Sequence, residues 1–358
     1  MPTGGHDVKT VGTLQLADGQ VYPGELAGTA SVQGEVVFFT GMTGYQEVLT
    51  DPSYRGQIIV FTYPLIGQYG VSAADSESQQ IQVAGVVVQT LANNGTESDL
   101  ADWLAASDIP VLSQVDTRAL VHHLRTYGDQ VGSIGLNEQS SSQPSDLIAT
   151  VSTKTHQVHE TDQADGHVVC LDYGVKKSMI DALNARRMKV TVVPFDTPKS
   201  VIDELKPDGL LFSNGPGDPV QLDHLTADIK QLAVAYPTLG ICMGHQIIAK
   251  AFGCQIEKQH HGHRGANHPV RELATGRVFM TSQNHGYVVQ ATSVEASELV
   301  PAYQHINDGS IEGLIHPAYP ILTVQFHPEA HPGPVEAMVI FDQFVASILK
   351  QEVAYARS

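Results

Sequence analysis

Short apolar runs separated by turn residues dominate the first part of the chain. Runs that are rich in Val, Ile and Phe predict strands, here at residues 35–40, 56–63 and 83–88. Apolar residues that recur every three or four positions predict helices at 98–107 and 116–125, and Asp116 stands where an N-cap is expected. We therefore predict a mixed α/β domain over residues 1–150.

A polar segment follows this domain. Residues 137–166 are rich in Ser, Gln, Thr and Asp and contain one short apolar patch. Such a composition is typical of a connection between domains. We predict a linker at residues 151–165, close to the end of the segment.

Strands and helices alternate regularly in the rest of the chain. The apolar pattern predicts strands at 167–174, 188–195, 208–214 and 238–241. It predicts helices at 176–187, 199–206 and 223–235, and an amphipathic helix at 334–351. This alternation indicates right-handed βαβ units, so we expect an α/β domain with a mostly parallel sheet over residues 166–358. Ligands of such sheets bind beyond the carboxyl ends of the strands.

The composition argues against several classes of function. Thirty-eight acidic against 20 basic side chains give a net charge of -18, which repels nucleic acids and anionic membrane surfaces. The sequence has no apolar stretch of about 20 residues, and its start lacks the apolar core of a signal peptide. Its three cysteines show no CxxC spacing. We expect a cytoplasmic protein with free thiols and without nucleic-acid or membrane partners.

One cysteine is set apart by its neighbours. Cys242 lies between a predicted strand and a predicted helix, with Gly240 and Gly244 on either side. Small flanking residues permit the sharp turn of a nucleophile elbow, and a helix N-terminus favours the thiolate. A buried, inert thiol explains the same spacing equally well, since cysteine is among the most buried residue types.

The residues after a later apolar run supply the partners that a nucleophile needs. His327 follows "LTVQF", and Glu329 stands two residues on. A histidine that takes and returns a proton, with a carboxylate that orients it, completes a Cys-His-Glu triad. The two motifs together favour the catalytic interpretation over a buried thiol and a structural histidine.

These motifs resemble those of the triad-type class I glutamine amidotransferases. The stretches "GICMGHQ" and "VQFHPE" carry this resemblance, which covers about residues 166–350. The stretches "SNGPGDP", "GHRGANHPV", "TSQNHGYVV" and "HPGP" are similar to those of carbamoyl phosphate synthetase small subunits. Residues 34–70 and "DTRALVHHLR" are similar to the amino-terminal domain of the same subunits. The resemblance therefore spans nearly the whole chain.

The resemblance implies a reaction and a set of residues that carry it. Cys242 would attack the side-chain amide of L-glutamine, His327 would protonate the departing ammonia, and water would hydrolyse the glutamyl thioester to glutamate. The family pattern assigns the oxyanion hole to the backbone of Gly215 and Met243. It assigns the contacts with glutamine to Ser53, Gly215, Gly217, Met243, Gln246, Asn284, Gly286 and Tyr287. Because Ser53 lies in the predicted first domain, the resemblance implies that this domain reaches the active site.

A histidine-rich stretch invites a metal interpretation. The sequence "QHHGHRGANHPV" contains His260, His261, His263 and His268. Their spacing fits no compact zinc motif, and thiolate catalysis needs no metal. The resembling family has a glycine-histidine loop at this place without a catalytic ion. We therefore expect no metal site in this chain.

The sequence shows no means of activating a substrate with ATP. It contains no GxxxxGK[ST] phosphate loop, and "NGPGDP" does not match GxGxxG. Ammonia in neutral water is mostly ammonium, so it is useful only when it is delivered directly to a second site. The resemblance implies a heterodimer with a large carbamoyl phosphate synthetase subunit, which can assemble further. That partner would bind ATP and magnesium and make carbamoyl phosphate for arginine synthesis, pyrimidine synthesis or both, while this chain binds no cofactor.

Two other functions use the same residues. A stand-alone cysteine hydrolase, such as a peptidase or γ-glutamyl hydrolase, would have the same elbow but leaves the first domain unexplained. A regulatory subunit that has lost its activity would show a damaged triad, whereas Cys242, His327 and Glu329 are all present. Two departures from the family pattern are Met243, where leucine is usual, and His331, where serine is usual.

Overall fold

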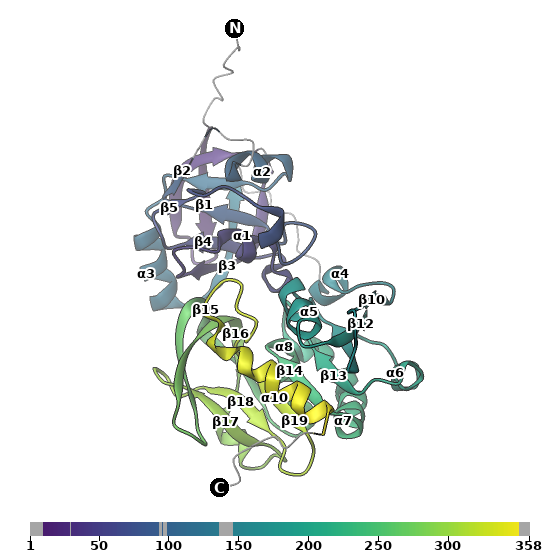
Figure 1. Cartoon of the computed structure of the whole chain (residues 1–358). Helices are drawn as coiled ribbons and strands as arrows, with labels where there is room; N and C mark the ends of the chain where they lie inside the picture. The colour runs from purple at the N-terminus through teal and green to yellow at the C-terminus, as the bar shows by residue number, and fades with distance from the viewer. Residues whose placement is uncertain (1–9, 29, 93–94, 96–98, 136–145, 351–358) are drawn as a thin grey trace. The chain divides into compact units, whose positions relative to one another are not determined.

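The computed structural model of the chain describes residues 10–28, 30–92, 95, 99–135 and 146–350 (Figure 1). The chain divides into two compact units. The first comprises Met1–Thr50, Tyr54–Asp75 and Gln80–Pro144, and the second comprises Asp51–Ser53, Ser76–Gln79 and Ser145–Ser358. Two short segments from the first part of the chain therefore belong to the second unit, and one of them contains Ser53.

A closed barrel forms the first unit, with the strand order β1-β2-β8-β6-β4-β3-β9. The strands are β1 (Thr10–Leu16), β2 (Val21–Ala27), β3 (Val32–Phe39), β4 (Ile58–Phe61), β6 (Gly85–Val87), β8 (Val111–Ser113) and β9 (Gln130–Gly135). The pairs β3–β4, β4–β6 and β6–β8 are parallel. Alternate residues of β3 enter two cores, Val36 and Phe38 in one and Val37 and Phe39 in the other. A strand that is buried on both faces has a continuously apolar sequence, which is why this run was predictable.

Short helices and strands complete the first unit. They are α1 (Tyr45–Thr50), α2 (Leu100–Ala106), α3 (Thr117–Tyr127), β5 (Leu65–Ile66) and β7 (Thr90–Leu91), with the 3₁₀ turn η2 (Ala73–Asp75). The 3₁₀ turn η1 (Pro52–Tyr54) is divided, with Pro52 and Ser53 in the second unit and Tyr54 in the first. The predicted cap of α3 is confirmed, because the Asp116 carboxylate accepts a hydrogen bond from the N–H of Ala119 at 2.9 Å. The pairing of the strands into a barrel was not predicted.

The second unit is built on a ten-stranded sheet with the order β10-β12-β11-β13-β14-β19-β18-β16-β15-β17. The strands are β10 (Gln157–His159), β11 (Gly166–Asp172), β12 (Met188–Pro194), β13 (Gly209–Phe212), β14 (Thr238–Ile241), β15 (Ile256–Glu272), β16 (Val278–Val289), β17 (Val300–His305), β18 (Ile311–Ile315) and β19 (Ile321–Val324). The strands from β12 to β19 in this order are parallel, as predicted. The strands on either side of them pair antiparallel.

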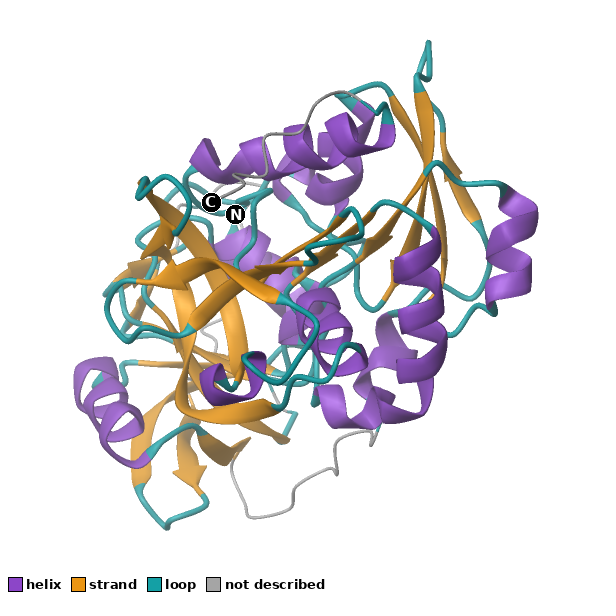
Figure 2. Ribbon diagram, turned by 90° about the horizontal axis from the view of Figure 1, so that it is seen from below, coloured by secondary structure: helices purple, strands orange, loops and turns teal. Residues whose placement is uncertain are grey.

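Helices lie along both faces of this sheet (Figure 2). They are α4 (Leu147–Val151), α5 (Lys177–Asn184), α6 (Lys199–Leu205), α7 (Thr226–Ala235), α8 (Met243–Ala251), α9 (Ala291–Val294) and α10 (Val339–Ile348), with 3₁₀ turns η3 (Pro219–Leu225) and η4 (Val335–Met338). Met179 of α5 and Phe344 of α10 pack in one core, and Leu232 of α7 and Ile247 of α8 pack in the other. The sheet is thus covered on both faces, as parallel strands require.

The predicted linker is part of the second unit. Residues 151–165 contain β10, which pairs antiparallel with β12. The polar composition of this stretch hid the strand, because an edge strand is held by backbone hydrogen bonds and needs few apolar side chains. Residues 151–165 therefore include a strand of the second unit, and the bounds of the linker stay a prediction.

Among the residues that the structure describes, no helix is long and apolar enough to cross a lipid bilayer. The three cysteines, Cys170, Cys242 and Cys254, are free, as expected, and all three are buried.

Candidate active site

Cys242 occupies the turn between β14 and α8. Its φ of 54° and ψ of -100° belong to a region that side chains other than glycine seldom adopt. Its N–H donates to the carbonyl oxygen of Val324 at 2.9 Å, which holds the turn against β19. A Cβ at Gly244 would stand 2.0 Å from the carbonyl oxygen of Phe212. The turn thus requires the glycine that the sequence pattern indicated, as in a nucleophile elbow.

We expect Gly244→Ala to destabilise the protein by about 1–3 kcal/mol, because the backbone at Phe212 must move to admit a methyl group. Gly166→Ala is a matched control in the same unit, since the nearest heavy atom to a Cβ there is 3.2 Å away, the sulfur of Met188. Urea unfolding measures the free energy of unfolding of both variants. A Gly244→Ala chain as stable as the wild type would show that the turn relaxes without cost.

His327 follows β19 and is held by the backbone and by a carboxylate. Its backbone N–H donates to the carbonyl oxygen of Ser282 at 2.9 Å, and its ring nitrogen Nδ1 lies 2.6 Å from Oε1 of Glu329. Both side chains are almost completely buried. Nε2 of His327 is buried without a hydrogen bond to any residue that the structure describes. Because Glu329 fixes Nδ1, Nε2 is the ring nitrogen left for proton transfer.

The neighbouring charges raise the pKa of His327. Burial lowers this pKa, but Glu329 and then the thiol of Cys242 outweigh burial and raise it to about 10. The thiol also lies 3.5 Å from the backbone carbonyl oxygen of Asn284. A histidine that holds a proton beside the thiol can pass that proton to a leaving group.

A buried lysine pairs with the carboxylate. Nζ of Lys176 lies 3.0 Å from Oε1 of Glu329 and donates to the carbonyl oxygens of Ala330 and His331 at 2.7 and 2.8 Å. Burial raises the pKa of Glu329, but Lys176 and His327 outweigh it and lower that pKa to about 2. The carboxylate therefore stays ionised beside His327. Lys176 cannot be identified from the sequence, because a lysine at the start of a helix is ordinarily solvated.

A second buried carboxylate organises part of the predicted glutamine site. Asp51 accepts hydrogen bonds from the N–H of Ser53 at 2.9 Å, the side-chain amide of Asn214 at 3.2 Å and that of Asn284 at 3.1 Å. The amide of Asn214 also donates to the hydroxyl of Ser53 at 2.8 Å. The structure thus brings Ser53 and Asn284 together through Asp51. The sequence analysis missed Asp51, because "TDPSY" carries only the signal of a turn.

Gln246 connects α8 to the strand that carries three predicted contacts. Its side-chain amide donates to the carbonyl oxygen of Tyr287 at 3.0 Å and to Oε1 of Gln325 at 3.1 Å. Gly286 precedes Tyr287 in β16. Because Asn284 lies in the same strand and its carbonyl faces the thiol, this segment runs beside the elbow.

The loop after β13 contains the two glycines of the predicted oxyanion motif. A Cβ at Gly215 would stand 2.2 Å from the carbonyl oxygen of Tyr173, and Gly217 has a φ of 91°. Both positions require glycine for their backbone geometry. The N–H of Gly244, in the first turn of α8, donates to the carbonyl oxygen of Ser213 at 3.0 Å, which joins this loop to the elbow.

Comparison with known proteins identifies the family. Residues 169–347 match the glutamine amidotransferase class-I family, and residues 14–134 match the CPSase domain of the carbamoyl-phosphate synthase small chain. The carbamoyl phosphate synthase arginine-specific small chain of Halalkalibacterium halodurans is 47% identical over 348 residues, which cover 94% of this chain and 96% of that protein. The chain belongs to the carbamoyl phosphate synthase small-chain family.

Two further members of the small-chain family bear the same arginine-specific description. The one from Geobacillus stearothermophilus is 48% identical over 350 residues, 96% of this chain and 99% of that protein. The one from Bacillus subtilis is 46% identical over 354 residues, with the same two shares of 96% and 99%. The likeness therefore extends over both units of this small chain, as the sequence motifs had indicated.

Both departures from the small-chain pattern concern side chains whose backbone the site uses. Met243 packs its side chain in a core of the second unit while its backbone begins α8. A change between leucine and methionine is close to volume-conserving and costs little in such a place. The side chain of His331 is 56% exposed, and its carbonyl oxygen accepts the hydrogen bond from Lys176. Neither substitution removes a contact that the triad needs.

Proposed function

We propose that this small chain hydrolyses L-glutamine with the Cys242–His327–Glu329 triad and delivers the ammonia to a large carbamoyl phosphate synthase chain. The observation that carries the proposal is the strained elbow of Cys242 beside a histidine whose Nδ1 lies 2.6 Å from a buried carboxylate. The matched amidotransferase family and the names of the relatives support the same reaction.

The first half of the reaction forms a thioester. The thiolate of Cys242 attacks the side-chain carbonyl carbon of glutamine, and the carbonyl oxygen becomes an oxyanion. The proposed donors to this oxyanion are the backbone N–H groups of Gly215 and Met243. Met243 lies in the first turn of α8, where N–H groups lack partners within the helix. Protonated His327 gives its Nε2 proton to the amide nitrogen, the C–N bond breaks, and ammonia leaves.

The second half releases glutamate. Neutral His327 takes a proton from water at Nε2, and the resulting hydroxide attacks the thioester carbon. The C–S bond breaks, glutamate leaves, and the thiolate and the imidazolium are restored. Glu329 stays ionised throughout and holds the ring, with Lys176 as its partner.

The proposed glutamine contacts are those that the resemblance to the family implies. The residues are Ser53, Gly215, Gly217, Met243, Gln246, Asn284, Gly286 and Tyr287. Ser53 and Asn284 share hydrogen bonds with Asp51, and Gln246 is bonded to the backbone of Tyr287. These bonds support a preorganised set of amides and hydroxyls, which suits the polar ends of an amino acid.

The ammonia needs an acceptor that this chain does not supply. We propose a heterodimer with a large chain that binds ATP and magnesium and makes carbamoyl phosphate from ammonia and bicarbonate. Because three relatives at 46 to 48% identity are described as arginine-specific, we propose that the carbamoyl phosphate serves arginine synthesis. The stand-alone hydrolase is less well supported, because both matched families and whole-length relatives are those of a synthase small chain.

The experiment follows the amide nitrogen. The wild-type chain is incubated with glutamine labelled at its amide nitrogen, alone and with a large carbamoyl phosphate synthase chain. We expect glutamate in both mixtures and labelled carbamoyl phosphate only when both chains are present. Unlabelled ammonia added to the mixture should reduce the labelled fraction of the carbamoyl phosphate only slightly. Glutamate without labelled carbamoyl phosphate would point to a stand-alone hydrolase. Absence of glutamate from both mixtures would contradict the proposal.

A further inference from the structure

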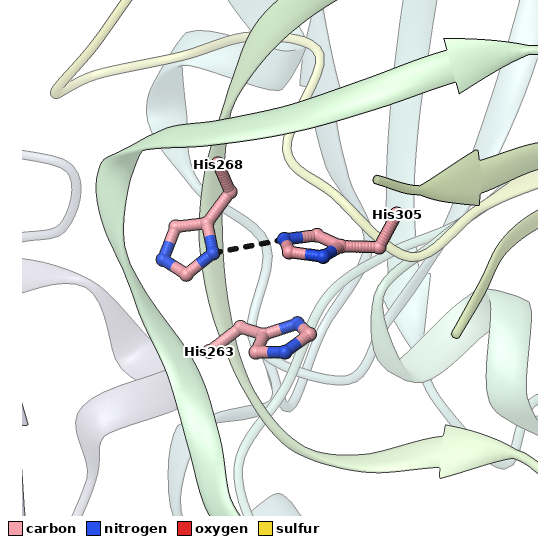
Figure 3. A group of neighbouring side chains, drawn as sticks. All are labelled: His263, His268 and His305. Carbon is pink, nitrogen blue, oxygen red and sulfur yellow. Dashed lines mark hydrogen bonds between the residues drawn. The ribbon is translucent and has the colours of Figure 1, made fainter. Parts of the chain in front are cut away.

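Three histidines from two strands converge on one point (Figure 3). His263 and His268 belong to β15, and His305 ends β17. Each offers one ring nitrogen, and these nitrogens all lie within 4.8 Å of one another. We propose that His263, His268 and His305 bind a divalent transition-metal ion of the zinc type.

A bulge in β15 brings the first two histidines to one side. Residues five apart on a regular strand point to opposite faces, because side chains alternate. The pairing of β15 with β16 shifts register between Gly265 and His268. An extra residue in a strand reverses the alternation, so His263 and His268 can approach the same point. The spacing of the histidines in the sequence looked wrong for a metal because this shift is not visible there.

The third histidine comes from a neighbouring strand. β15 pairs antiparallel with β17, and Val270 lies opposite His305. This pairing places Nε2 of His305 3.2 Å from Nδ1 of His268. Two nitrogens bound to one tetrahedral zinc ion at 2.0–2.1 Å lie about 3.4 Å apart. The observed separation is therefore close to the one that a shared ion would impose.

A carboxylate stands behind two of the rings. Asp308 lies 3.2 Å from Nδ1 of His305 and 2.8 Å from Nε2 of His263. Histidine ligands of metals commonly donate their second ring nitrogen to a carboxylate, which orients the ring and leaves the first nitrogen for the ion. Nδ1 of His263 lies 3.7 Å from Oε1 of the buried Glu312, which is beyond hydrogen-bond distance.

The same nitrogens allow a second arrangement without metal. Nδ1 of His305 also lies 3.3 Å from the N–H of Asn307. If this nitrogen accepts from Asn307, then Nε2 carries the proton and donates to Nδ1 of His268. An ion would select the other tautomer, in which Nδ1 of His305 donates to Asp308. The experiment below decides between the two arrangements.

An alternative group around the same histidine is less suited to an ion. His263, His285 and Glu312 also place ligand atoms within 4.8 Å of one another. Both ring nitrogens of His285 already lie at hydrogen-bond distance from other groups, the carbonyl oxygen of Tyr287 at 3.0 Å and Oε1 of Gln283 at 2.8 Å. Compared with this group, the set of His263, His268 and His305 leaves more ring nitrogens available to bind an ion.

The test uses the full chain without a histidine tag, freed of metal by a chelator and titrated with Co²⁺. We expect one Co²⁺ per chain with the visible absorption of a tetrahedral site, displaced by Zn²⁺. His268→Ala and His305→Ala should lower the affinity at least 100-fold, and Asp308→Asn by about 10- to 100-fold. His260→Ala, an exposed histidine of the same strand, should bind as the wild type does.

Two measurements keep the result specific. Circular dichroism verifies that each variant is folded, and the isosteric Asp308→Asn serves if an alanine variant does not fold. Binding should persist in Cys242→Ser, which shows that the thiol is not the ligand. A wild-type chain that binds no Co²⁺, or binding that the His268, His305 and Asp308 variants leave unchanged, would overturn the proposal in favour of the histidine–histidine hydrogen bond.

Discussion

Replacing Cys242 by serine is expected to abolish glutamine-dependent carbamoyl phosphate formation by the two-chain complex, while formation from ammonia persists. The loss should be on the order of 10⁴- to 10⁶-fold, as for other nucleophiles that act as part of a triad. A hydroxyl is far less acidic than a thiol, so the serine is not ionised beside His327. We propose that the ATP-dependent steps take place on the large chain, so they should be untouched.

Cys254→Ser is the control for this variant. Cys254 is a buried thiol beyond the end of α8, and the triad makes no use of it. The control should keep both the glutamine-dependent and the ammonia-dependent rates. Substantial glutamine-dependent synthesis in Cys242→Ser would show that another residue is the nucleophile. Loss of both rates would show that the substitution disturbs the complex instead.

Replacing Lys176 by methionine is expected to lower the free energy of unfolding by up to about 3–5 kcal/mol, because it removes a cation from the buried carboxylate of Glu329 and leaves His327 to balance that charge. The rate of glutamine hydrolysis should also fall, since the orientation of the His327 ring depends on that carboxylate. Urea unfolding and glutamate formation measure the two effects. Lys177→Met is the matched control, because its ion pair with Asp181 is more than half exposed and contributes at most about 1 kcal/mol.

The pH dependence of this effect has a definite sign. The pKa of Glu329 is lowered from 4.5 to about 2, so its contribution to stability is present above pH 4.5 and is lost as the pH falls toward 2. Without Lys176, the burial that raises this pKa is less opposed, and the loss should begin at higher pH. The double variant Lys176→Met/Glu329→Gln should recover part of this stability, because the buried carboxylate is removed together with its lysine and His327, no longer beside a carboxylate, can lose its proton. A Lys176→Met chain within about 1 kcal/mol of the wild type would contradict the argument.

The central part of the second unit was predictable because its signal is local. The strands β11, β13 and β14 are short apolar runs followed by helices, and buried parallel strands read in this way. The antiparallel strands β15 to β18 were not predicted. Half-exposed strands carry polar side chains, and their pairing depends on partners far along the chain. Closure of the first unit into a barrel was not predicted for the same reason, because it depends on pairing between strands far apart in the sequence.

The nucleophile, its histidine and its carboxylate were predictable for a similar reason. Each lies at the end of an apolar strand, and the carboxyl ends of neighbouring parallel strands meet at one edge of the sheet. The structure places Cys242 after β14 and His327 after β19, and these two strands are hydrogen-bonded to each other. Short motifs therefore carried enough information to name the triad, although its catalytic role stays a proposal.

The residues that support the site were decided by the tertiary structure alone. Lys176, Asp51 and His305 look ordinary in the sequence, as a helix start, a turn and a strand end. Lys176 becomes the partner of Glu329 only through burial, and Asp51 links Ser53 to Asn284 only because its segment packs in the second unit. His305 joins two histidines only through a strand pair and a bulge. Local sequence patterns record which residues are apolar or strained, whereas pairing of buried polar groups depends on distances that only the folded chain sets.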